Sequence, residues 1–519
     1  MYQSRWQRDP NIAAMSFIAF CLAYILLRPL LPVDETRYLT VAWEMWISCS
    51  YIVPHLNGEP YSHKPPLLFW LIHLVWVVFG PTELGARLIG PLAGAATILL
   101  TARLAMALWP GDRARPGLSA WILATTGAFL LFGSATMFDA LLGMSIVLAM
   151  LALWKLAVAP SVLSGAMFGA AIAFGVLAKG PVVAVHILPV LLTLPFWKPV
   201  DSTLTRRSVW KPLCIAALSA STLVSLWLIP AALLGGEEYR NAILWHQSAG
   251  RVASSFAHQR PFWFYAALLP LFLWPWGWGR ELFSLRERPL TPPTRFLLIW
   301  AVGAFLSFSL ISGKQIHYLI PELPALALLF SARLPKRSGP LFTCLALLPA
   351  AVLILGSIAV AHGRLEPAWL DGTRPTEFDI AQSCIILAMA VFLIFFARTR
   401  FEATVMAAPA TLLIVHLLAS TPVWQTNDTG PLGALLADVG KNGAATLESS
   451  YTGQFTFSAR LPEPVRILHS REEYQFWRKT KPNGVLLARD SQVPENADLL
   501  WMGVVHGDTW YVYRFETAD

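Results

Sequence analysis

Long apolar stretches alternate with short polar connections over the first four fifths of the chain. Apolar windows of about 18 to 25 residues recur from residue 13 to residue 420, and each can cross a hydrocarbon core of roughly 30 Å. We predict thirteen membrane-spanning helices near residues 13–32, 84–108, 118–137, 139–158, 162–178, 181–197, 212–234, 262–279, 295–312, 317–333, 340–361, 379–397 and 402–420. This pattern is typical of a polytopic α-helical membrane protein.

The apolar stretch 66–79 is too short to be one of these spans. It has 14 residues, follows Pro65 and Pro66, and ends at Gly80-Pro81. We predict that it is a helix lying on the membrane surface.

Basic residues in the short connections predict the orientation of the chain. With the N-terminus in the cytoplasm, nearly every basic cluster falls on the cytoplasmic side, from Arg5 and Arg8 to Arg398 and Arg400. If 66–79 crossed the membrane, every later cluster would change side. An odd number of spans puts the C-terminus outside, and the clusters account for the net charge of +8 without a nucleic-acid partner.

The pattern changes near residue 421 to short alternating runs that are typical of strands. Val465–Leu468 and Gly484–Leu487 are two such runs, and Asp498–Val505 and Thr509–Phe515 flank a turn as in a β-hairpin. We therefore predict two domains. Residues 1–420 form the transmembrane domain, with an external catalytic loop at 33–83, and residues 421–519 form a small soluble α/β domain outside the membrane.

Composition agrees with a membrane protein and excludes several other classes. The chain of 519 residues is 56% hydrophobic and only 13% charged, and its 22 tryptophans suit membrane interfaces. The five cysteines form no metal-binding or redox spacing. No phosphate-binding glycine loop stands between a strand and a helix, so we expect no nucleotide cofactor. The first apolar stretch is longer than a signal-peptide core, and we expect it to be a retained helix.

Ionisable residues are concentrated on the predicted outer side. The first external loop carries Asp34-Glu35-Thr36-Arg37-Tyr38 and, about 25 residues later, Tyr61-Ser62-His63-Lys64. Other outer connections carry Asp139, Lys179, His246, Arg251, Lys314 and Tyr318. Such groups are expensive near a membrane interior and are usually functional, so we expect them to converge on one site.

The chemistry of this set suits transfer of a sugar from a lipid phosphate. Cations and tyrosine hydroxyls can hold a phosphate that must leave. A carboxylate can deprotonate an acceptor or stabilise positive charge on a sugar carbon. Two alternatives are a lipid or solute transporter and a non-catalytic polyprenyl-phosphate binder. Transporters place polar sites near mid-membrane within repeated halves, whereas these charges lie at one surface and no repeat is evident.

Each of these residues also has a purely structural interpretation. Asp34 and Glu35 could end the first helix, Lys179 could extend its ammonium to the interface, and Asp139 could be a helix cap. His186 and His416 lie inside apolar segments, where we interpret them as buried polar groups without an assigned function.

The first loop resembles that of the lipid A aminoarabinose transferases. These belong, with the protein O-mannosyltransferases, to the integral-membrane glycosyltransferases of the GT-C type, which use polyprenyl-phosphate sugars. The resemblance rests on Asp34–Tyr38, Trp43–Met45, Pro54–Gly58, Tyr61–Leu67, the Leu177–Pro181 turn, His246–Arg251, Arg260–Trp263 and Lys314–Tyr318. It spans most of residues 1–335.

The resemblance implies roles for individual residues. Asp34 would be the principal catalytic carboxylate, with Glu35 and Asp139 as further acidic groups. Lys64, Lys179, Arg251, Tyr318 and Tyr38 would hold the donor phosphate, and Arg37, Tyr61 and Lys314 would support the site. The family commonly has a glutamate before the loop lysine, paired with a loop histidine at a metal. Here those positions are His63 and His246, which could bind zinc.

The resemblance also implies an activity and a location. We expect transfer of an aminoarabinose-like sugar or a hexose from undecaprenyl phosphate to a lipid A, glycan or protein acceptor, with inversion. The expected location is the periplasmic face of the bacterial inner membrane.

Overall fold

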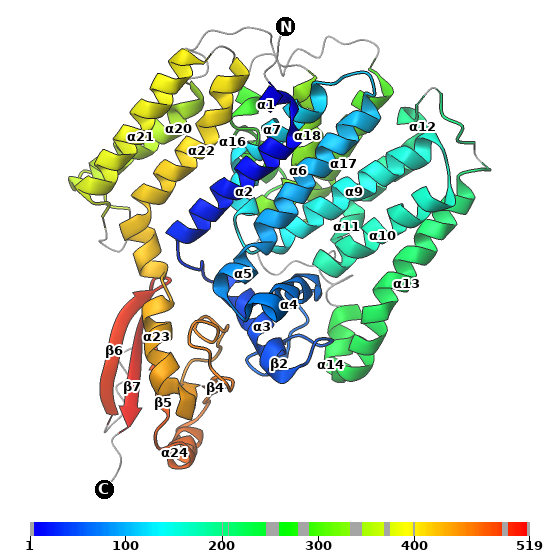
Figure 1. The fold of residues 1–519 in the computed structure, drawn as a ribbon. Coiled ribbons are helices and arrows are strands. Elements are labelled where there is room, and N and C mark those ends of the chain that lie inside the picture. The colour runs from blue at the N-terminus through cyan, green and yellow to red at the C-terminus, as the bar shows by residue number, and fades with distance from the viewer. Residues whose placement is uncertain are drawn as a thin grey trace.

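The computed structural model is a bundle of long helices with a small α/β unit at one end (Figure 1). It describes residues 5–199, 201–205, 207–244, 259–278, 290–332, 345–367, 374–397, 400–489 and 497–515. The predicted site residues His246 and Arg251 lie outside these ranges.

Long apolar helices make up the bundle. They are α2 (Pro10–Leu27), α6 (Ile89–Leu108), α9 (Phe138–Val158), α10 (Val162–Lys179), α13 (Trp210–Leu234), α17 (Pro292–Leu310), α21 (Glu377–Phe396) and α22 (Arg400–Leu418). Among the described residues, seven helical runs are long and apolar enough to cross a membrane, or nine if two bent pairs each count as one span. The polytopic helical class is confirmed, and the count of thirteen stays a prediction.

Shorter elements connect and flank these helices. The α-helices among them are α1 (Arg5–Arg8), α7 (Arg115–Ala124), α8 (Gly127–Gly133), α11 (Val183–Leu192), α12 (Leu194–Trp197), α14 (Gly236–Asn241), α16 (Phe264–Phe272), α18 (Leu323–Ser331) and α20 (Leu348–Ala361). The 3₁₀-helices are η1 (Gly180–Val182), η3 (Trp276–Trp278), η5 (Ile316–Glu322), η6 (Leu345–Leu347) and η9 (Gly440–Asn442), and η8 (Ser420–Gln425) is a π-helix.

A break with a local cause interrupts the predicted span 118–137. Helices α7 and α8 meet at 65°. The hydroxyls of Thr125 and Thr126 donate to carbonyls one turn back, at 2.6 and 2.7 Å, and the Gly127 N–H donates to the Trp274 carbonyl instead of continuing the helix. The span is therefore a bent pair of helices.

Glycines allow α10 and α13 to pack closely. A Cβ atom on Gly165 would lie 2.4 Å from the Pro212 carbonyl oxygen, and one on Gly169 would lie 2.1 Å from the Ala216 carbonyl oxygen. Two small residues four positions apart are a common contact surface between membrane helices, because dispersion forces need close approach.

The predicted external loop 33–83 is largely regular structure. It contains α3 (Asp34–Ser48), a hairpin of β1 (His55–Leu56) and β2 (Glu59–Pro60), α4 (Leu67–Phe79) and the start of α5 (Glu83–Arg87). The sequence pattern predicts no helix over residues 34–48, where the structure has α3. That helix has too few apolar residues to stand out in a pattern of long apolar windows.

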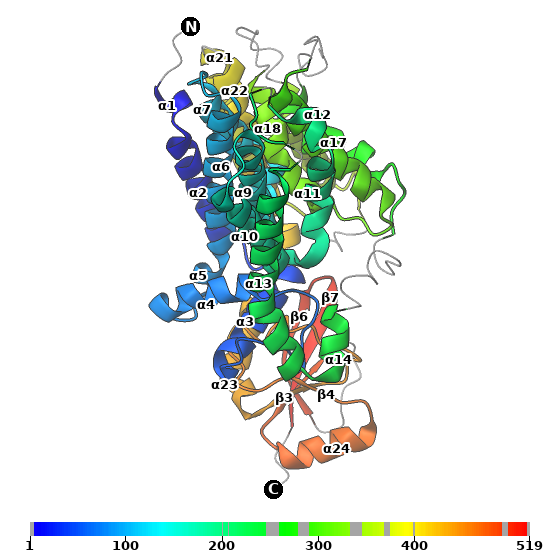
Figure 2. The ribbon, with the colours of Figure 1, turned by 90° about the vertical axis from the view of Figure 1, so that its right-hand side faces the viewer.

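Helix α4 agrees with the predicted surface helix. It runs across the direction of the long helices (Figure 2) and exposes Leu74, Val77, Val78 and Phe79. Its other face buries Phe69 and Trp76. An apolar face left exposed beside a membrane bundle is typical of a helix that lies in the interface.

The C-terminal unit is a five-stranded sheet with helices. Its elements are α23 (Gly430–Val439), β3 (Ala444–Thr446), β4 (Arg466–Ile467), α24 (Arg471–Thr480), β5 (Val485–Ala488), β6 (Ala497–Val505) and β7 (Asp508–Phe515). The strand order is β4-β3-β5-β7-β6, with parallel pairs around β3 and antiparallel pairs around β7.

The predicted strands and hairpin of this unit are confirmed. Val505 pairs with Asp508, and the two turn residues His506 and Gly507 have positive φ, as a two-residue hairpin requires. Along β5, Val485 and Leu487 join one apolar cluster while Leu486 and Ala488 join another, so both faces of the sheet are covered.

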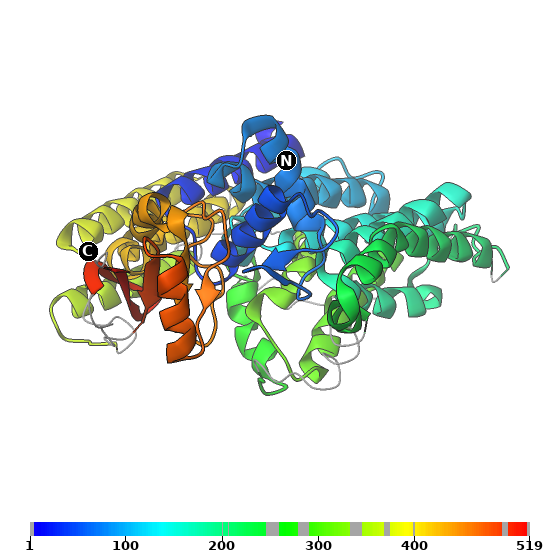
Figure 3. The same ribbon diagram turned by 90° about the horizontal axis from the view of Figure 1, so that it is seen from below.

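The α/β unit docks on α3 and its hairpin. Seen from below, the two parts lie beside each other (Figure 3). The contacts are Thr40 hydroxyl to Gly453 carbonyl (2.5 Å), Trp43 indole to Leu461 carbonyl (2.9 Å), and two bonds between Asn57 and Val465 (2.9 and 2.8 Å). The unit therefore supports the helix on which the first predicted site residues lie.

Candidate functional site

Asp34 begins α3 and presents its carboxylate at the end of the bundle that faces the α/β unit. One carboxylate oxygen accepts hydrogen bonds from the Tyr38 hydroxyl at 3.0 Å and from the Arg37 guanidinium at 3.1 Å. The Asp34 side chain is still 47% exposed. It is thus oriented by two neighbours and remains accessible to a reactant.

Glu35 is buried behind Asp34 and has a full set of partners. Its carboxylate accepts two bonds from the Arg28 guanidinium, at 2.5 and 3.0 Å, and one each from the Leu31 and Thr136 N–H groups, at 3.0 and 2.8 Å. Its side chain is 3% exposed. Glu35 therefore fastens the start of α3 to the segment before α9, and its catalytic role stays a prediction.

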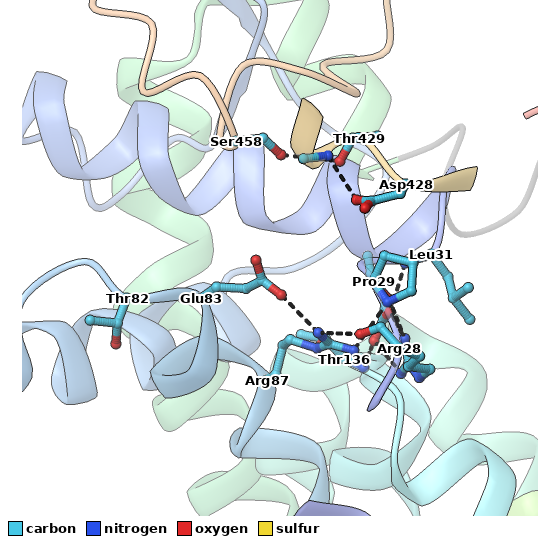
Figure 4. A network of polar contacts seen from close by, with 12 residues as sticks. Arg28, Pro29, Leu31, Thr82, Glu83, Arg87, Thr136, Asp428, Thr429 and Ser458 are labelled. Carbon is cyan, nitrogen blue, oxygen red and sulfur yellow. Dashed lines mark hydrogen bonds and ion pairs between the residues drawn. The ribbon is translucent and has the colours of Figure 1, made fainter. Parts of the chain in front are cut away.

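A second arginine extends this network (Figure 4). The Arg87 guanidinium donates to Glu83 at 2.7 Å and to the carbonyls of Arg28 and Pro29 at 3.1 and 3.3 Å. Burial alone would raise the pKa of Glu35, but the Arg28 charge and its hydrogen bonds outweigh burial and hold that pKa at about 2. The network is therefore ionised at neutral pH.

Replacing Glu35 by glutamine should lower the free energy of unfolding by about 3 to 5 kcal/mol at pH 7, because Arg28 would stay buried without its counter-charge. The folded pKa of Glu35 lies below its ordinary value of 4.5. Its charge therefore contributes stability above about pH 4.5, and this contribution is lost as pH falls towards 2. Chemical unfolding in detergent at pH 7 and pH 4 measures this. A difference between variant and wild type that grows on acidification would contradict the assignment.

Asp139 and Lys179 form a buried ion pair. Asp139 is in the first turn of α9 and Lys179 is the last residue of α10, and Lys179 Nζ lies 2.5 Å from Asp139 Oδ1. Their side chains are 3% and 8% exposed. The Nε2 atom of His317, on η5, lies 3.8 Å from the other Asp139 oxygen. Asp139 therefore holds a lysine and a histidine from two other segments.

Aromatic rings lie under both lysines. Lys179 Nζ is 4.7 Å from the ring centre of Tyr318, and Lys64 Nζ is 5.6 Å from that of Phe138. The Phe138 ring also contacts the Tyr38 ring edge-on, with centroids 4.9 Å apart. Ring faces attract ammonium groups, so these contacts orient the two cations towards the same region.

These residues form one electrostatic unit, which we call the site cluster. It consists of Asp34, Tyr38, Lys64, Asp139, Lys179, His317 and Tyr318. The charges of Lys64 and Lys179 both act on Asp139, and the charge of Asp34 acts on His317. The predicted convergence therefore holds for six members of the set, which are Asp34, Tyr38, Lys64, Asp139, Lys179 and Tyr318. Their individual roles stay predictions.

The supporting residues occupy different positions. Lys314 is buried and donates to the carbonyls of Arg260 and Ile311, at 3.0 and 2.5 Å, so it ties the chain before α16 to the end of α17. Tyr61 is buried, with its ring 5.2 Å from the ring of His63. The predictions for Arg251 and His246 fall outside the described residues.

The described residues give no closed metal site. No group of three or more histidine, cysteine, aspartate or glutamate side chains is placed to hold a metal within the described ranges. Of the predicted zinc pair, His63 is exposed and His246 lies outside the described residues, so the zinc site stays a prediction. The chemistry below takes no step through a metal.

Residue-by-residue reasoning assigned no role to Phe138, Arg28 or His317. Phe138 carries no signal of its own, because its partners Lys64 and Tyr38 are distant in sequence. Arg28 ends an apolar stretch, seven residues before its partner Glu35, and its pairing there depends on the turn between them. His317 had a signal, since it stands beside Tyr318 in a polar connection of an apolar chain.

Comparisons with known proteins find several similar chains. A family model described as dolichyl-phosphate-mannose-protein mannosyltransferase matches residues 63–227. An undecaprenyl phosphate-alpha-4-amino-4-deoxy-L-arabinose arabinosyl transferase of Pseudomonas paraeruginosa is 32% identical over 59% of this chain and 55% of its own length. A transferase of the same name from Pseudomonas savastanoi is 28% identical over 68% of this chain and 67% of its own. The chain thus spans only 55% of the length of the first of these relatives.

One solved structure extends the likeness to the whole fold. ArnT from Cupriavidus metallidurans, bound to undecaprenyl phosphate, superposes with a TM-score of 0.75, covers 97% of each chain, and has 19% sequence identity. The same protein in its apo state gives a TM-score of 0.70. The resemblance predicted from the first-loop motif is confirmed, and this chain is a multi-span membrane protein with the fold of the aminoarabinose transferases.

Proposed function

We propose that this protein is a glycosyltransferase that uses a polyprenyl-phosphate sugar. It would transfer an aminoarabinose-like sugar or a hexose from undecaprenyl phosphate to a lipid A, glycan or protein acceptor. The site cluster is the observation that carries this proposal, because it gathers two lysines, two carboxylates and two tyrosines from separate segments at one end of the bundle. The names of the relatives and the lipid bound to ArnT support the choice of donor.

The donor phosphate would bind between Lys64 and Lys179. A lipid phosphate leaves as an anion, so its departure needs positive charge and hydrogen-bond donors more than a proton. The Asp139 carboxylate holds Lys179 at 2.5 Å and would keep its ammonium aimed at the phosphate. Tyr318 would donate a further hydrogen bond from its hydroxyl, and Tyr38 would turn its single hydroxyl hydrogen from Asp34 to the phosphate.

The acceptor would meet Asp34. A bond from the acceptor oxygen to the anomeric carbon would form while the bond from that carbon to the phosphate oxygen breaks, so the configuration inverts. A hydroxyl acceptor would give its proton to the Asp34 carboxylate. A phosphate acceptor has no proton to lose, and Asp34 would then orient the acceptor and stabilise positive charge on the sugar carbon.

The site would face the periplasm of a bacterial inner membrane, with the N-terminus in the cytoplasm and the C-terminus outside. The distribution of lysine and arginine in the connections supports this orientation. Labelling single introduced cysteines with a membrane-impermeant reagent tests it. Labelling at Ser449 in the α/β unit of intact spheroplasts is expected, and labelling near Arg113 instead would reverse the orientation.

A zinc ion bound by His63 and His246 is a separate part of the proposal, and the transfer steps above do not depend on it. Its test is activity after exhaustive chelation. Loss that zinc alone restores would support the ion, and unchanged transfer would remove it.

Transfer itself is tested with purified protein in lipid vesicles that contain radiolabelled undecaprenyl-phosphate aminoarabinose or a labelled hexose donor, with lipid A as acceptor. We expect label to appear in the acceptor and undecaprenyl phosphate to be released. Binding of donor without turnover would favour a non-catalytic binder. Movement of intact donor between leaflets would favour a transporter. Lipid and glycan profiles of a deletion strain identify the acceptor by one missing sugar mass.

A further inference from the structure

A third buried polar pair lies in the bundle and takes no part in the proposed reaction. His186 Nδ1, on α11, lies 2.6 Å from Glu322 Oε1, at the end of η5. The two side chains are 0% and 4% exposed. Each keeps one buried atom, His186 Nε2 and Glu322 Oε2, without a hydrogen-bond partner among the described residues. Polar groups at this depth are expensive, so the pair calls for a functional explanation.

The pair joins the two segments that carry Lys179 and Tyr318. Helix α11 follows Lys179 after the single turn η1, and Glu322 ends the same η5 that holds Tyr318. The segments therefore touch twice: once where the Lys179 ammonium lies 4.7 Å from the Tyr318 ring centre, and once at the His186–Glu322 bond.

Phe308 on α17 closes this arrangement. Its ring lies 5.0 Å from the His186 ring and 5.7 Å from the Tyr318 ring, measured between centroids. A shift of either ring would be transmitted through Phe308 to the other. The chain from Glu322 through His186 and Phe308 to Tyr318 is thus one continuous set of contacts.

Segment η5 needs such external anchors. It is a 3₁₀-helix of seven residues, longer than is usual for a helix with this poor hydrogen-bond geometry. Pro321 inside it has no N–H to donate. At the start of η5, the Tyr265 hydroxyl donates to the Gln315 carbonyl at 3.1 Å. At its end, the anchor is the bond between His186 and Glu322.

We infer that His186 and Glu322 are positioning residues that fix η5 so that Tyr318 and His317 are held against Lys179 and Asp139. This inference rests on the proposed function, because it assumes that Tyr318 helps to bind the donor phosphate. A purely structural pair would serve equally well as two packed apolar side chains, which leave no buried polar atom unpartnered.

The test compares donor KM, kcat and thermal unfolding of four variants in vesicles with the undecaprenyl-phosphate sugar as donor. Glu322→Leu should raise the donor KM by about 10- to 100-fold, because a displacement of roughly 1 Å at a binding group has effects of this size. Glu322→Gln should stay near wild type, since its amide oxygen can accept the same bond. The double variant with His186→Phe and Glu322→Leu should have the same raised donor KM as Glu322→Leu. Its unfolding temperature should equal or exceed that of the wild type.

His416→Leu is the matched control. His416 is also a buried membrane histidine with an unpartnered ring nitrogen among the described residues, but it packs on Tyr24 and Trp424, away from η5. Its donor KM should be unchanged. An unchanged donor KM in Glu322→Leu, or a donor KM restored to the wild-type value in the double variant, would overturn the inference. The proposed function would stand in either case as long as the wild-type protein transfers sugar. Wild-type protein that neither transfers nor binds undecaprenyl phosphate would reject both.

Discussion

Replacing Asp34 by asparagine is expected to reduce sugar transfer by about a thousandfold, within the range that a positioned general base or charge-stabilising carboxylate contributes. Asparagine can still accept the hydrogen bonds from Tyr38 and Arg37, which are 3.0 and 3.1 Å long, so the shape of the site should persist. What is lost is the negative charge at the anomeric carbon or the proton acceptor. The loss should appear in kcat and in kcat/KM together, because the interaction is made in the transition state.

The stability of the Asp34→Asn variant should hardly change, since an exposed ion pair contributes only about 0 to 1 kcal/mol. The chain offers a closely matched control in Asp112. Asp112 pairs with Arg115 three residues later at 2.8 Å, as Asp34 pairs with Arg37 at 3.1 Å, and the two carboxylates are 37% and 47% exposed. Asp112→Asn should transfer sugar at the wild-type rate. Full activity in Asp34→Asn would remove Asp34 from the reaction.

The second large effect is expected at the buried pair of Asp139 and Lys179. Asp139→Leu leaves the Lys179 ammonium buried without its partner, which should lower the free energy of unfolding by about 3 to 5 kcal/mol. Transfer should fall at least about a hundredfold, because Lys179 would no longer be held in place for the phosphate. Chemical unfolding in detergent and the vesicle transfer assay measure the two effects separately.

A double variant separates stability from function at this pair. Asp139→Leu combined with Lys179→Met replaces both charges by apolar groups of similar size, which is often neutral or stabilising for a buried ion pair. We expect the stability to return and the transfer to stay low, since the phosphate would still lack the Lys179 cation. Recovery of transfer in the double variant would mean that the pair only supports the fold.

The fold was predictable wherever its cause is local. Apolar windows long enough to cross a membrane marked the bundle, and strand-like alternation marked β4, β5 and the β6–β7 hairpin. Helix α3 was not predicted because it has too few apolar residues to form a long apolar window. It is held by α4 nearby in the chain and also by distant partners, as in the bond from the Trp43 indole to the Leu461 carbonyl.

The candidate site was likewise predictable only in part from the sequence. The sequence alone determined which residue types stand in the outer connections, because a charge in an apolar chain is visible without a structure. It also ranked Asp34, Lys64 and Lys179 as important. It did not show how Asp34 and Glu35, two adjacent carboxylates, differ in burial and in hydrogen-bond partners.

Only the tertiary structure made that distinction, by placing Thr136 and Arg28 around Glu35 while leaving Asp34 open. It also paired Asp139 with Lys179 across 40 positions and His186 with Glu322 across 136. The physical reason is that helix and strand patterns follow from neighbours along the chain, whereas burial, counter-charges and hydrogen-bond partners at a site depend on which distant segments pack together.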